Sequence, residues 1–390
     1  MRKRVLSGMR PSGQLHLGHY LGVLVNWKKL QEENDCFFFV ADWHALTTEY
    51  DRTAVIRESI DDMVIDWMAS GIDPGKATLF IQSHVPEHAE LHLLLSMITP
   101  LPWLERNPTY KEQLREQTSR DLQTYGFLGY PVLQAADILM YDATLVPVGI
   151  DQVPHLELTR EIARRFNFLY RECLTIPEAY LTETSKLMGT DNRKMSKSYD
   201  NAILLSDTSV EVWAKVKPMV TDPARQRRTD CGNPEICNVF SYHKIFSDEA
   251  TIAKVDVGCR TAGIGCIECK KWMFEGMEKV LAPVREKRRQ VVEGGVSVRD
   301  ILADGTRRAR EVAGAKMAQG SRRCPDLTTG RISPGNPATP RQAPSVTFRC
   351  VSTSSRAPST SCCTWSATRS STSTTSRSRR SPSSTWSTST

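Results

Sequence analysis

The feature that most constrains the fold is a regular alternation of strand-like and helix-like segments between positions 4 and 83. Residues 4–9, 36–43 and 77–83 predict strands, and the continuous apolar run at 36–43 fits a strand that is buried on both faces. Between them, residues 18–34 and 53–71 repeat apolar side chains at helical spacing. Strands that alternate with helices in this way pair in parallel through right-handed crossovers, which predicts an α/β fold with a parallel sheet.

The alternation continues further along the chain and then stops. Residues 143–149 predict another strand, and residues 151–167 predict the helix after it. Beyond residue 206 the strand signals fade and charged helical segments dominate. We therefore expect a Rossmann-like domain at 1–206 with a helical insertion at about 86–128, followed by an all-helical domain at 207–319.

The end of the chain differs in composition from the rest. Residues 320–390 are rich in Ser, Thr and Arg, and the segment 321–390 holds ten arginines, no lysine and one acid. Such a segment buries too little apolar surface to offset its ordering entropy, so we expect it to be disordered. Two interpretations stay open: a basic tail that binds RNA, or out-of-frame translation of a GC-rich gene from near residue 319.

The charge balance of the remaining chain limits how it meets nucleic acid. The net charge is +7, of which the segment 321–390 supplies +9, so the segment 1–320 carries −2. Any binding of nucleic acid by this part must come from local basic patches. The sequence has no long apolar run that could span a membrane and no signal-peptide pattern at its start, so we expect a cytoplasmic protein with no membrane association.

A first motif follows the first predicted strand, in "GMRPSGQLHLGHYLG". His16 and His19 are spaced to share one face at the start of a helix, and Gly18 lets a ligand approach the backbone. A helix start offers free N–H groups and a positive dipole end to a phosphate chain. A zinc pair, or two ordinary histidines, would also fit the pattern, although no further metal ligand is adjacent in sequence.

A second motif, "KMSKS", lies in the polar loop "GTDNRKMSKSYDNAIL". Lys194 and Lys197 either face water or close over a polyanion. The two motifs, in this order on an alternating α/β pattern, resemble the class I aminoacyl-tRNA synthetases. The segments "VADWHALTT", "YPVLQAADILMYDATLVPVG" and "DQVPHLELTREIARRFN" are similar to bacterial tryptophanyl-tRNA synthetases, and the resemblance covers about residues 3–318.

The resemblance implies a homodimeric ligase that joins L-tryptophan to tRNA(Trp) with ATP and Mg²⁺. Tryptophanyl-adenylate and pyrophosphate form first, and the amino acid then passes to the 3′ end of the tRNA. Two other functions remain as alternatives: a tyrosyl-tRNA synthetase, or a small-molecule nucleotidyltransferase that does not act on tRNA. An Asp that accepts the indole N–H would separate tryptophan from an apolar ring.

The resemblance also assigns roles to individual residues. The catalytic residues are expected to be His16, His19, Lys194 and Lys197. The ATP site is expected to comprise Arg10, Pro11, Ser12, Gly18, His19, Gly149, Ile150, Asp151, Leu187, Lys194, Met195, Ser196, Lys197 and Ser198. The tryptophan site is expected to comprise Asp137, Tyr130, Gln152 and His44. Ile150 stands where the family usually has an acid.

Four cysteines form a further cluster in the sequence: Cys237, Cys259, Cys266 and Cys269. In a cytoplasmic protein their spacing favours a metal over disulfides, and zinc is the general expectation. Similarity to a subset of tryptophanyl-tRNA synthetases implies a [4Fe–4S] cluster instead, with Cys231 as a spare or competing ligand. Since the cysteines are far in sequence from both ATP motifs, we expect a structural and tRNA-docking role.

Overall fold

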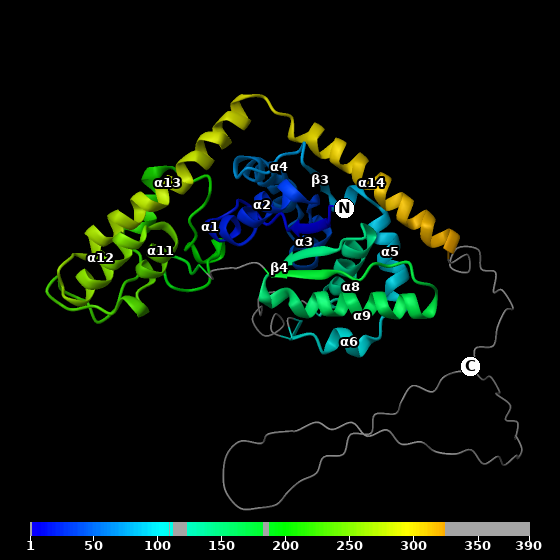
Figure 1. Ribbon diagram of the computed structural model, residues 1–390, viewed down its shortest axis with the longest axis horizontal. Helices are drawn as coiled ribbons and strands as arrows, with labels where there is room; N and C mark the ends of the chain where they lie inside the picture. Colours follow the sequence, from blue (N-terminus) through cyan, green and yellow to red (C-terminus); the bar gives the residue numbers. More distant parts are fainter. Residues whose placement is uncertain (1, 109, 112–122, 182–186, 324–390) are drawn as a thin grey trace, which may run out of the picture. The chain divides into compact units, whose positions relative to one another are not determined.

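The computed structural model describes residues 2–108, 110–111, 123–181 and 187–323, all within one compact unit, Met1–Arg331. Its centre is a five-stranded parallel sheet with strand order β3-β2-β1-β4-β5 (Figure 1). The strands are β1 Arg4–Met9, β2 Asp35–Val40, β3 Ala77–Ile81, β4 Leu145–Val148 and β5 Glu178–Leu181. The predicted Rossmann-like sheet is confirmed, and β5 is a strand that the sequence analysis did not predict.

Helices cover both faces of this sheet. They are α1 Leu17–His19, α2 Val25–Glu33, α3 Asp42–Glu49, α4 Thr53–Ala69, α5 Glu87–Ser96, α6 Leu101–Glu105, α8 Tyr125–Met140 and α9 Val153–Leu169. Alternate residues of β2 divide between two cores. Phe38 packs with Trp27 and Trp67 on one face, whereas Phe39 packs among side chains of α5, α8 and α9 on the other. Burial on both faces explains the continuous apolar run in the sequence.

Two predicted elements differ from the observed ones. The single helix expected at 18–34 is three segments, because a π-helical turn at Tyr20–Leu24 separates α1 from α2. The strand expected at 36–43 ends at Val40, and α3 begins two residues later. Asp42 lies in the first turn of α3, where the helix dipole favours a carboxylate. This preference favours a helix start at Asp42 over a longer strand.

Between residues 209 and 323 the described chain forms helices, as predicted. Its helices are α10 Ser209–Val216, α11 Asn238–Phe246, α12 Glu249–Arg260, α13 Cys266–Glu293 and α14 Val298–Arg323, with a short turn at Pro234–Ile236. Figure 1 shows α11, α12 and the start of α13 grouped together, away from the sheet. The long α14 returns to the sheet, where a Cβ at Gly305 would lie 1.8 Å from the Leu79 carbonyl oxygen. Only glycine permits this close backbone approach.

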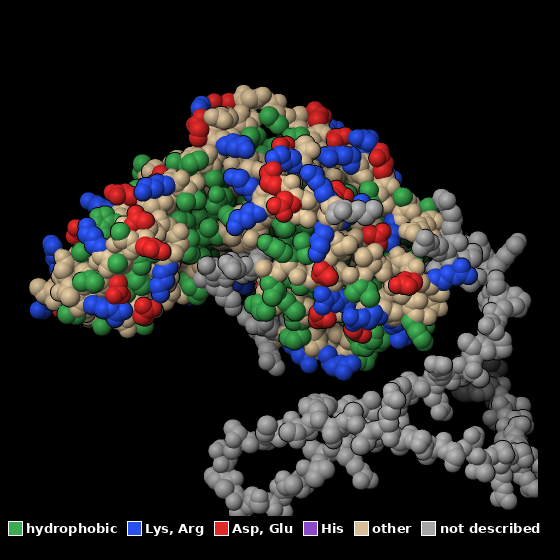
Figure 2. Space-filling model, in the orientation of Figure 1, with side chains coloured by type: hydrophobic (Ala, Val, Ile, Leu, Met, Phe, Trp, Pro, Cys, Tyr) green, Lys and Arg blue, Asp and Glu red, His purple; other side chains and the backbone are tan. Residues whose placement is uncertain are grey.

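The proposed division at residues 206 and 207, and the insertion at 86–128, stay predictions. The tail from residue 324 onward lies outside the described residues. Of the helices in the described part of the chain, none is long and apolar enough to cross a membrane. Figure 2 shows basic and acidic side chains mixed over the visible face, in keeping with the near-neutral charge of the segment 1–320.

Candidate active site

A cavity of about 630 Å³ lies at the carboxyl ends of β1, β2 and β4. It brings together most of the residues singled out from the sequence: Arg10, His16, Gly18, His19, His44, Tyr130, Asp137, Gly149, Ile150, Asp151, Gln152, Leu187, Lys194 and Met195. Pro11, Ser12, Ser196 and Lys197 are not among its lining residues. The side chain of Ser198 lies outside the described residues. A cleft beyond the strand ends is where open parallel sheets bind ligands.

The two histidines at the start of α1 are arranged as neutral donors. The Gly18 N–H donates to His16 Nδ1 at 3.1 Å, and the His16 N–H donates to His19 Nδ1 at 3.2 Å. Burial, helped by the charge of Lys197, lowers the pKa of His16 to about 4. Burial, together with His16 and nearby cations, lowers the pKa of His19 to about 3. Since each Nδ1 accepts, each Nε2 carries the proton and is a donor for a phosphate oxygen.

The basic loop is joined to the same segment. Lys197 Nζ donates to the Ser12 carbonyl at 2.5 Å, beside Gly13, which has a positive φ of 98°. A Cβ at Gly13 would lie 2.6 Å from that Nζ, so glycine is required there. Further along, the Leu17 N–H donates to the Ile203 carbonyl at 2.9 Å. The two motifs, although far apart in sequence, therefore form one structural unit.

Asn201 organises the inside of the basic loop. Its side-chain oxygen accepts the Ser196 N–H at 2.7 Å, and its Nδ2 donates to Asp191 at 2.7 Å and to the Lys194 carbonyl at 3.1 Å. Asn201 is buried, whereas Lys194 is exposed and lines the cavity. The hydrogen bonds of Asn201 thus fix the backbone from which Lys194 reaches the cavity.

Asp137 is fully buried beneath the cavity and receives four hydrogen bonds. His44 Nε2 donates to Oδ2 at 2.8 Å, His88 Nδ1 donates to Oδ1 at 2.6 Å, and Gln82 Nε2 donates to the two oxygens at 2.8 and 2.9 Å. Burial by itself would raise the pKa of Asp137, but His88 and His44 outweigh it and lower the pKa to about 2. Asp137 is therefore an ionised acceptor at neutral pH.

Sequence reasoning missed Gln82 and His88. His88 Nε2 accepts from the Tyr141 hydroxyl at 2.8 Å, because its Nδ1 must donate to the carboxylate. Gln82 follows β3 directly, and His88 is in the first turn of α5. Both residues could have been predicted from their position after the carboxyl end of a strand, because ligand-binding groups gather at that edge of the sheet.

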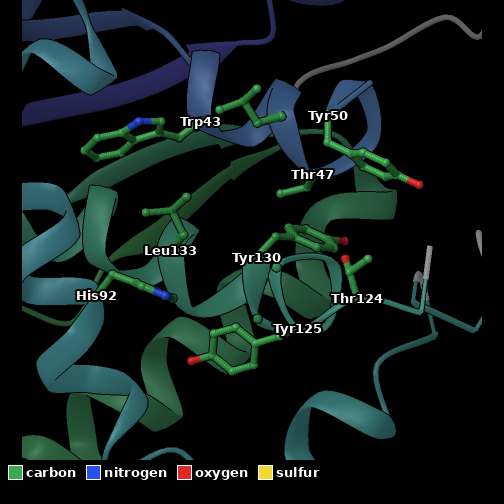
Figure 3. Close-up of a pocket in the computed structure, with 11 residues that line it drawn as sticks. Trp43, Thr47, Tyr50, His92, Thr124, Tyr125, Tyr130 and Leu133 are labelled. Atoms are coloured by element: carbon green, nitrogen blue, oxygen red, sulfur yellow. The ribbon is translucent and has the colours of Figure 1, made fainter. Parts of the chain in front are cut away.

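Tyr130 stands between the main cavity and a second, apolar cavity of about 350 Å³. Figure 3 shows Trp43 of α3 and Tyr50, which follows α3, facing Tyr125 and Tyr130 of α8 across this second cavity. Tyr130 Oη lies 2.5 Å from Nε2 of His155, another residue that was not predicted. Burial raises the pKa of Tyr130 to about 12, so the hydroxyl stays a neutral polar group at the cavity wall.

The four cysteines come from three helix ends. Cys237 precedes α11, Cys259 is in the last turn of α12, and Cys266 and Cys269 are in the first turn of α13. Burial, and then the neighbouring thiols, raise the pKa of Cys269 to about 12. Across the described ranges, no three His, Cys, Asp or Glu side chains are grouped so that they could hold a metal ion. The metal site expected from the sequence is therefore not shown by the described residues.

Comparison with known proteins agrees with this geometry. The family described as tRNA synthetases class I (W and Y) matches residues 1–282. The tryptophan–tRNA ligase of Thermotoga maritima is 55% identical over 318 residues, which cover 81% of this chain and 97% of that protein. The corresponding ligase of Aquifex aeolicus is 46% identical over 386 residues, covering 81% and 98%.

A solved structure gives the same result. The crystal structure of tryptophanyl-tRNA synthetase from Campylobacter jejuni, complexed with ADP and tryptophan, is 35% identical, with a TM-score of 0.72. The match covers 82% of this chain and 98% of that one. The chain therefore belongs to the class I tRNA synthetases for tryptophan and tyrosine, among their tryptophan–tRNA ligases.

Proposed function

We propose that this tryptophan–tRNA ligase forms tryptophanyl-adenylate in the 630 Å³ cavity, with ATP held by the two joined motifs and tryptophan held above Asp137. The observation that carries the proposal is that one cavity contains the donor histidines, Lys194 and the buried carboxylate. In the reaction, a tryptophan carboxylate oxygen attacks the α-phosphorus of ATP, and the bond to the pyrophosphate oxygen breaks. Such a step depends on positioning and charge stabilisation.

In the tryptophan half of the site, Asp137 is the acceptor for the indole N–H. Its two oxygens accept four hydrogen bonds, so an indole N–H must replace one donor. His44 lines the cavity, whereas Gln82 and His88 are not among its lining residues, so His44 is the donor that yields Oδ2 to the indole. Tyr130 and Gln152, which also line the cavity, contact the substrate ammonium group.

In the ATP half of the site, the proposed phosphate ligands are neutral N–H donors that need no change of protonation to bind. The Nε2–H groups of His16 and His19 bind phosphate oxygens, and Gly18 allows close approach. Lys194 and Lys197 neutralise the departing pyrophosphate. Residues 149–151 line the cavity where the ribose is expected, and Leu187 where the adenine is expected. Mg²⁺ enters with the ATP phosphates and offsets their charge.

We assign the partners as tRNA(Trp) and a second copy of the chain, in the cytoplasm. Large apolar side chains are exposed on α5 and directly after it, on α6, and at the start of α8: Leu93, Met97, Leu101 and Tyr125. Such side chains fit a self-complementary interface, which supports the homodimer. Light scattering on the purified protein should give twice the chain mass of 43.8 kDa. A monomer at micromolar concentration would contradict this assignment.

We further propose that Cys237, Cys259, Cys266 and Cys269 hold a [4Fe–4S] cluster. The support is the donor set: four neighbouring thiols from separate helix ends, with Arg225 Nη1 donating to Cys259 Sγ at 3.6 Å. A zinc ion needs all four sulfurs about 2.3 Å from one point. An iron–sulfur cluster is likewise held by four thiolates, so the number of ligands fits either metal, and the resemblance to the cysteine-containing subset favours the cluster.

The main proposal is tested by ATP–pyrophosphate exchange with each of the twenty amino acids. We expect exchange that depends on tryptophan, and a loss on the order of 100-fold in kcat/KM for Asp137→Ala, because the site loses the partner of the indole N–H. Equal exchange with tyrosine, or an unaffected Asp137→Ala variant, would overturn the assignment of the selector. Exchange with no amino acid would overturn the function.

A further inference from the structure

Helix α11 reaches the base of the basic loop with two buried side chains. Asn238 Nδ2 donates to the Gly189 carbonyl at 2.7 Å, and the Tyr242 hydroxyl donates to the Met188 carbonyl at 2.6 Å. Residues four apart share one helix face, so both bonds come from the same side of α11. Asn238 and Tyr242 are 2% and 0% exposed, which shields both bonds from competing water.

The two accepting carbonyls belong to the segment that fixes Lys194. Met188 pairs with Lys194 in an isolated antiparallel bridge, and the Gly189 N–H donates to the Arg193 carbonyl at 2.7 Å. A Cβ at Gly189 would lie 2.4 Å from the side chain of Asn201, the residue that organises the loop. Met188 and Gly189 therefore connect α11 to the backbone of Lys194.

Helix α11 also contacts two of the four cysteines. Cys237 is the residue directly before Asn238, and it is buried. One turn further along, His243 Nε2 lies 3.3 Å from Cys269 Sγ and 3.1 Å from the Cys269 carbonyl oxygen. The same helix is thus bounded by two of the four thiols and by the basic loop.

We infer that α11 couples the cysteine cluster to the ATP-binding loop, with Asn238 and Tyr242 as positioning residues for Lys194. The contacts of α11 with Cys237 and Cys269 set the position of the helix, and α11 sets how the loop meets ATP. The inference rests on the proposed function in one respect, that the loop closes over ATP. It adds a link to the ATP-binding loop to the structural and tRNA-docking role that we expect for the cysteines.

The first test removes the contacts of α11 and leaves the thiols intact. Asn238→Ala and Tyr242→Phe are compared with Ser241→Ala, an exposed position on the same helix. We expect hydrogen exchange of the amides at 188–196 to rise by about tenfold, and the KM for ATP by about fivefold, as fits the loss of one buried hydrogen bond. Iron content, and the KM for tryptophan, should match those of the Ser241→Ala control.

Tyr242→Phe keeps the aromatic ring, so it reports on the hydroxyl even if Asn238→Ala unfolds. Wild-type amide exchange and wild-type KM for ATP in a folded Tyr242→Phe variant would overturn the positioning role. A variant that loses tryptophan binding to the same extent as ATP binding would indicate a general structural role and would also overturn it.

The second test removes a thiol that is not adjacent to α11 in the chain. Cys266→Ser should raise amide exchange at 188–196 as Asn238→Ala does, and the double variant should add little to either single change. If Cys266→Ser impairs only tRNA charging and leaves the loop and the KM for ATP unchanged, the coupling is refuted while the proposed function stands. Absence of tryptophan-dependent exchange in the unaltered protein would instead remove the proposed function.

Discussion

Replacing His88 by leucine tests whether the buried network beneath the cavity determines tryptophan recognition. His88 is 0% exposed, donates to Asp137 at 2.6 Å and accepts from Tyr141 at 2.8 Å. Leucine removes both hydrogen bonds and replaces the imidazole ring with an apolar side chain of similar volume. Asp137 retains only Gln82 and His44, and tryptophan binding displaces His44 in the proposed site.

The magnitude follows from the two lost contacts. A hydrogen bond to an ionised buried group contributes about 1.5–3 kcal/mol, and each 1.4 kcal/mol changes an equilibrium constant tenfold. We therefore expect the KM for tryptophan to rise by roughly 10- to 100-fold, with the KM for ATP changed less than about threefold. The unpaired Tyr141 hydroxyl should also lower the free energy of unfolding by about 1–3 kcal/mol.

The same network makes the stability of the protein depend on pH. The pKa of Asp137 is lowered from 3.8 to about 2, so its contribution to folding is fully present above pH 4 and is lost as the pH falls toward 2. The shift corresponds to roughly 2 kcal/mol. Without His88 the pKa of Asp137 rises, so acid unfolding of the variant should begin at a higher pH than that of the unaltered protein.

The assay is tryptophan-dependent ATP–pyrophosphate exchange combined with thermal and acid unfolding. His84→Leu is the matched control, because His84 is exposed in the short turn between β3 and α5. An Asp137→Asn variant made in the His88→Leu background should cost less than the two single changes added together. A His88→Leu protein with the tryptophan KM of the His84→Leu control would refute the role of the network.

Three further outcomes are expected. Lys194→Ala and Lys197→Ala should lower the activation rate more than they weaken tryptophan binding, and a change confined to the tryptophan KM in transient kinetics would contradict this. Anaerobic purification should give a brown protein with about four irons per chain, whereas colourless protein with one zinc would refute the cluster. Deletion of residues 324–390 should leave exchange and melting temperature unchanged, and a selective loss of tRNA charging would restore the RNA-binding interpretation.

The central sheet was predictable because its strands carry their signal locally. β2 and β3 are mostly apolar and buried, since both of their faces are covered by helices. β5 escaped prediction because it is an edge strand in which Glu178 and Leu181 are exposed, so burial imposes no apolar pattern on it. The π-helical turn at Tyr20–Leu24 is likewise a local deviation that an apolar helical repeat does not reveal.

The candidate site was predictable where a residue lies in a short motif and unpredictable where its partner is distant. His16 and His19 lie within one helical turn, so their shared face follows from spacing. Gln82 and His88 meet Asp137 across 55 and 49 residues of sequence. Only the order of strands in the sheet brings those positions together, and a single sequence does not state which polar side chain lies opposite the carboxylate.

The proposed link between the cysteines and the basic loop could not be inferred from their separation in sequence. Their distance from both motifs predicts that losing the metal would impair tRNA charging more than pyrophosphate exchange. In the structure, Asn238 follows Cys237 directly and still donates to Gly189, 49 residues away, at the base of the basic loop. The bonds from Asn238 and Tyr242 contribute about 1 kcal/mol each. Together that is enough to change the population of a positioned loop by roughly 10- to 30-fold. Exchange should therefore fall together with charging when the thiols are altered, and the ratio of the two losses separates coupling from docking.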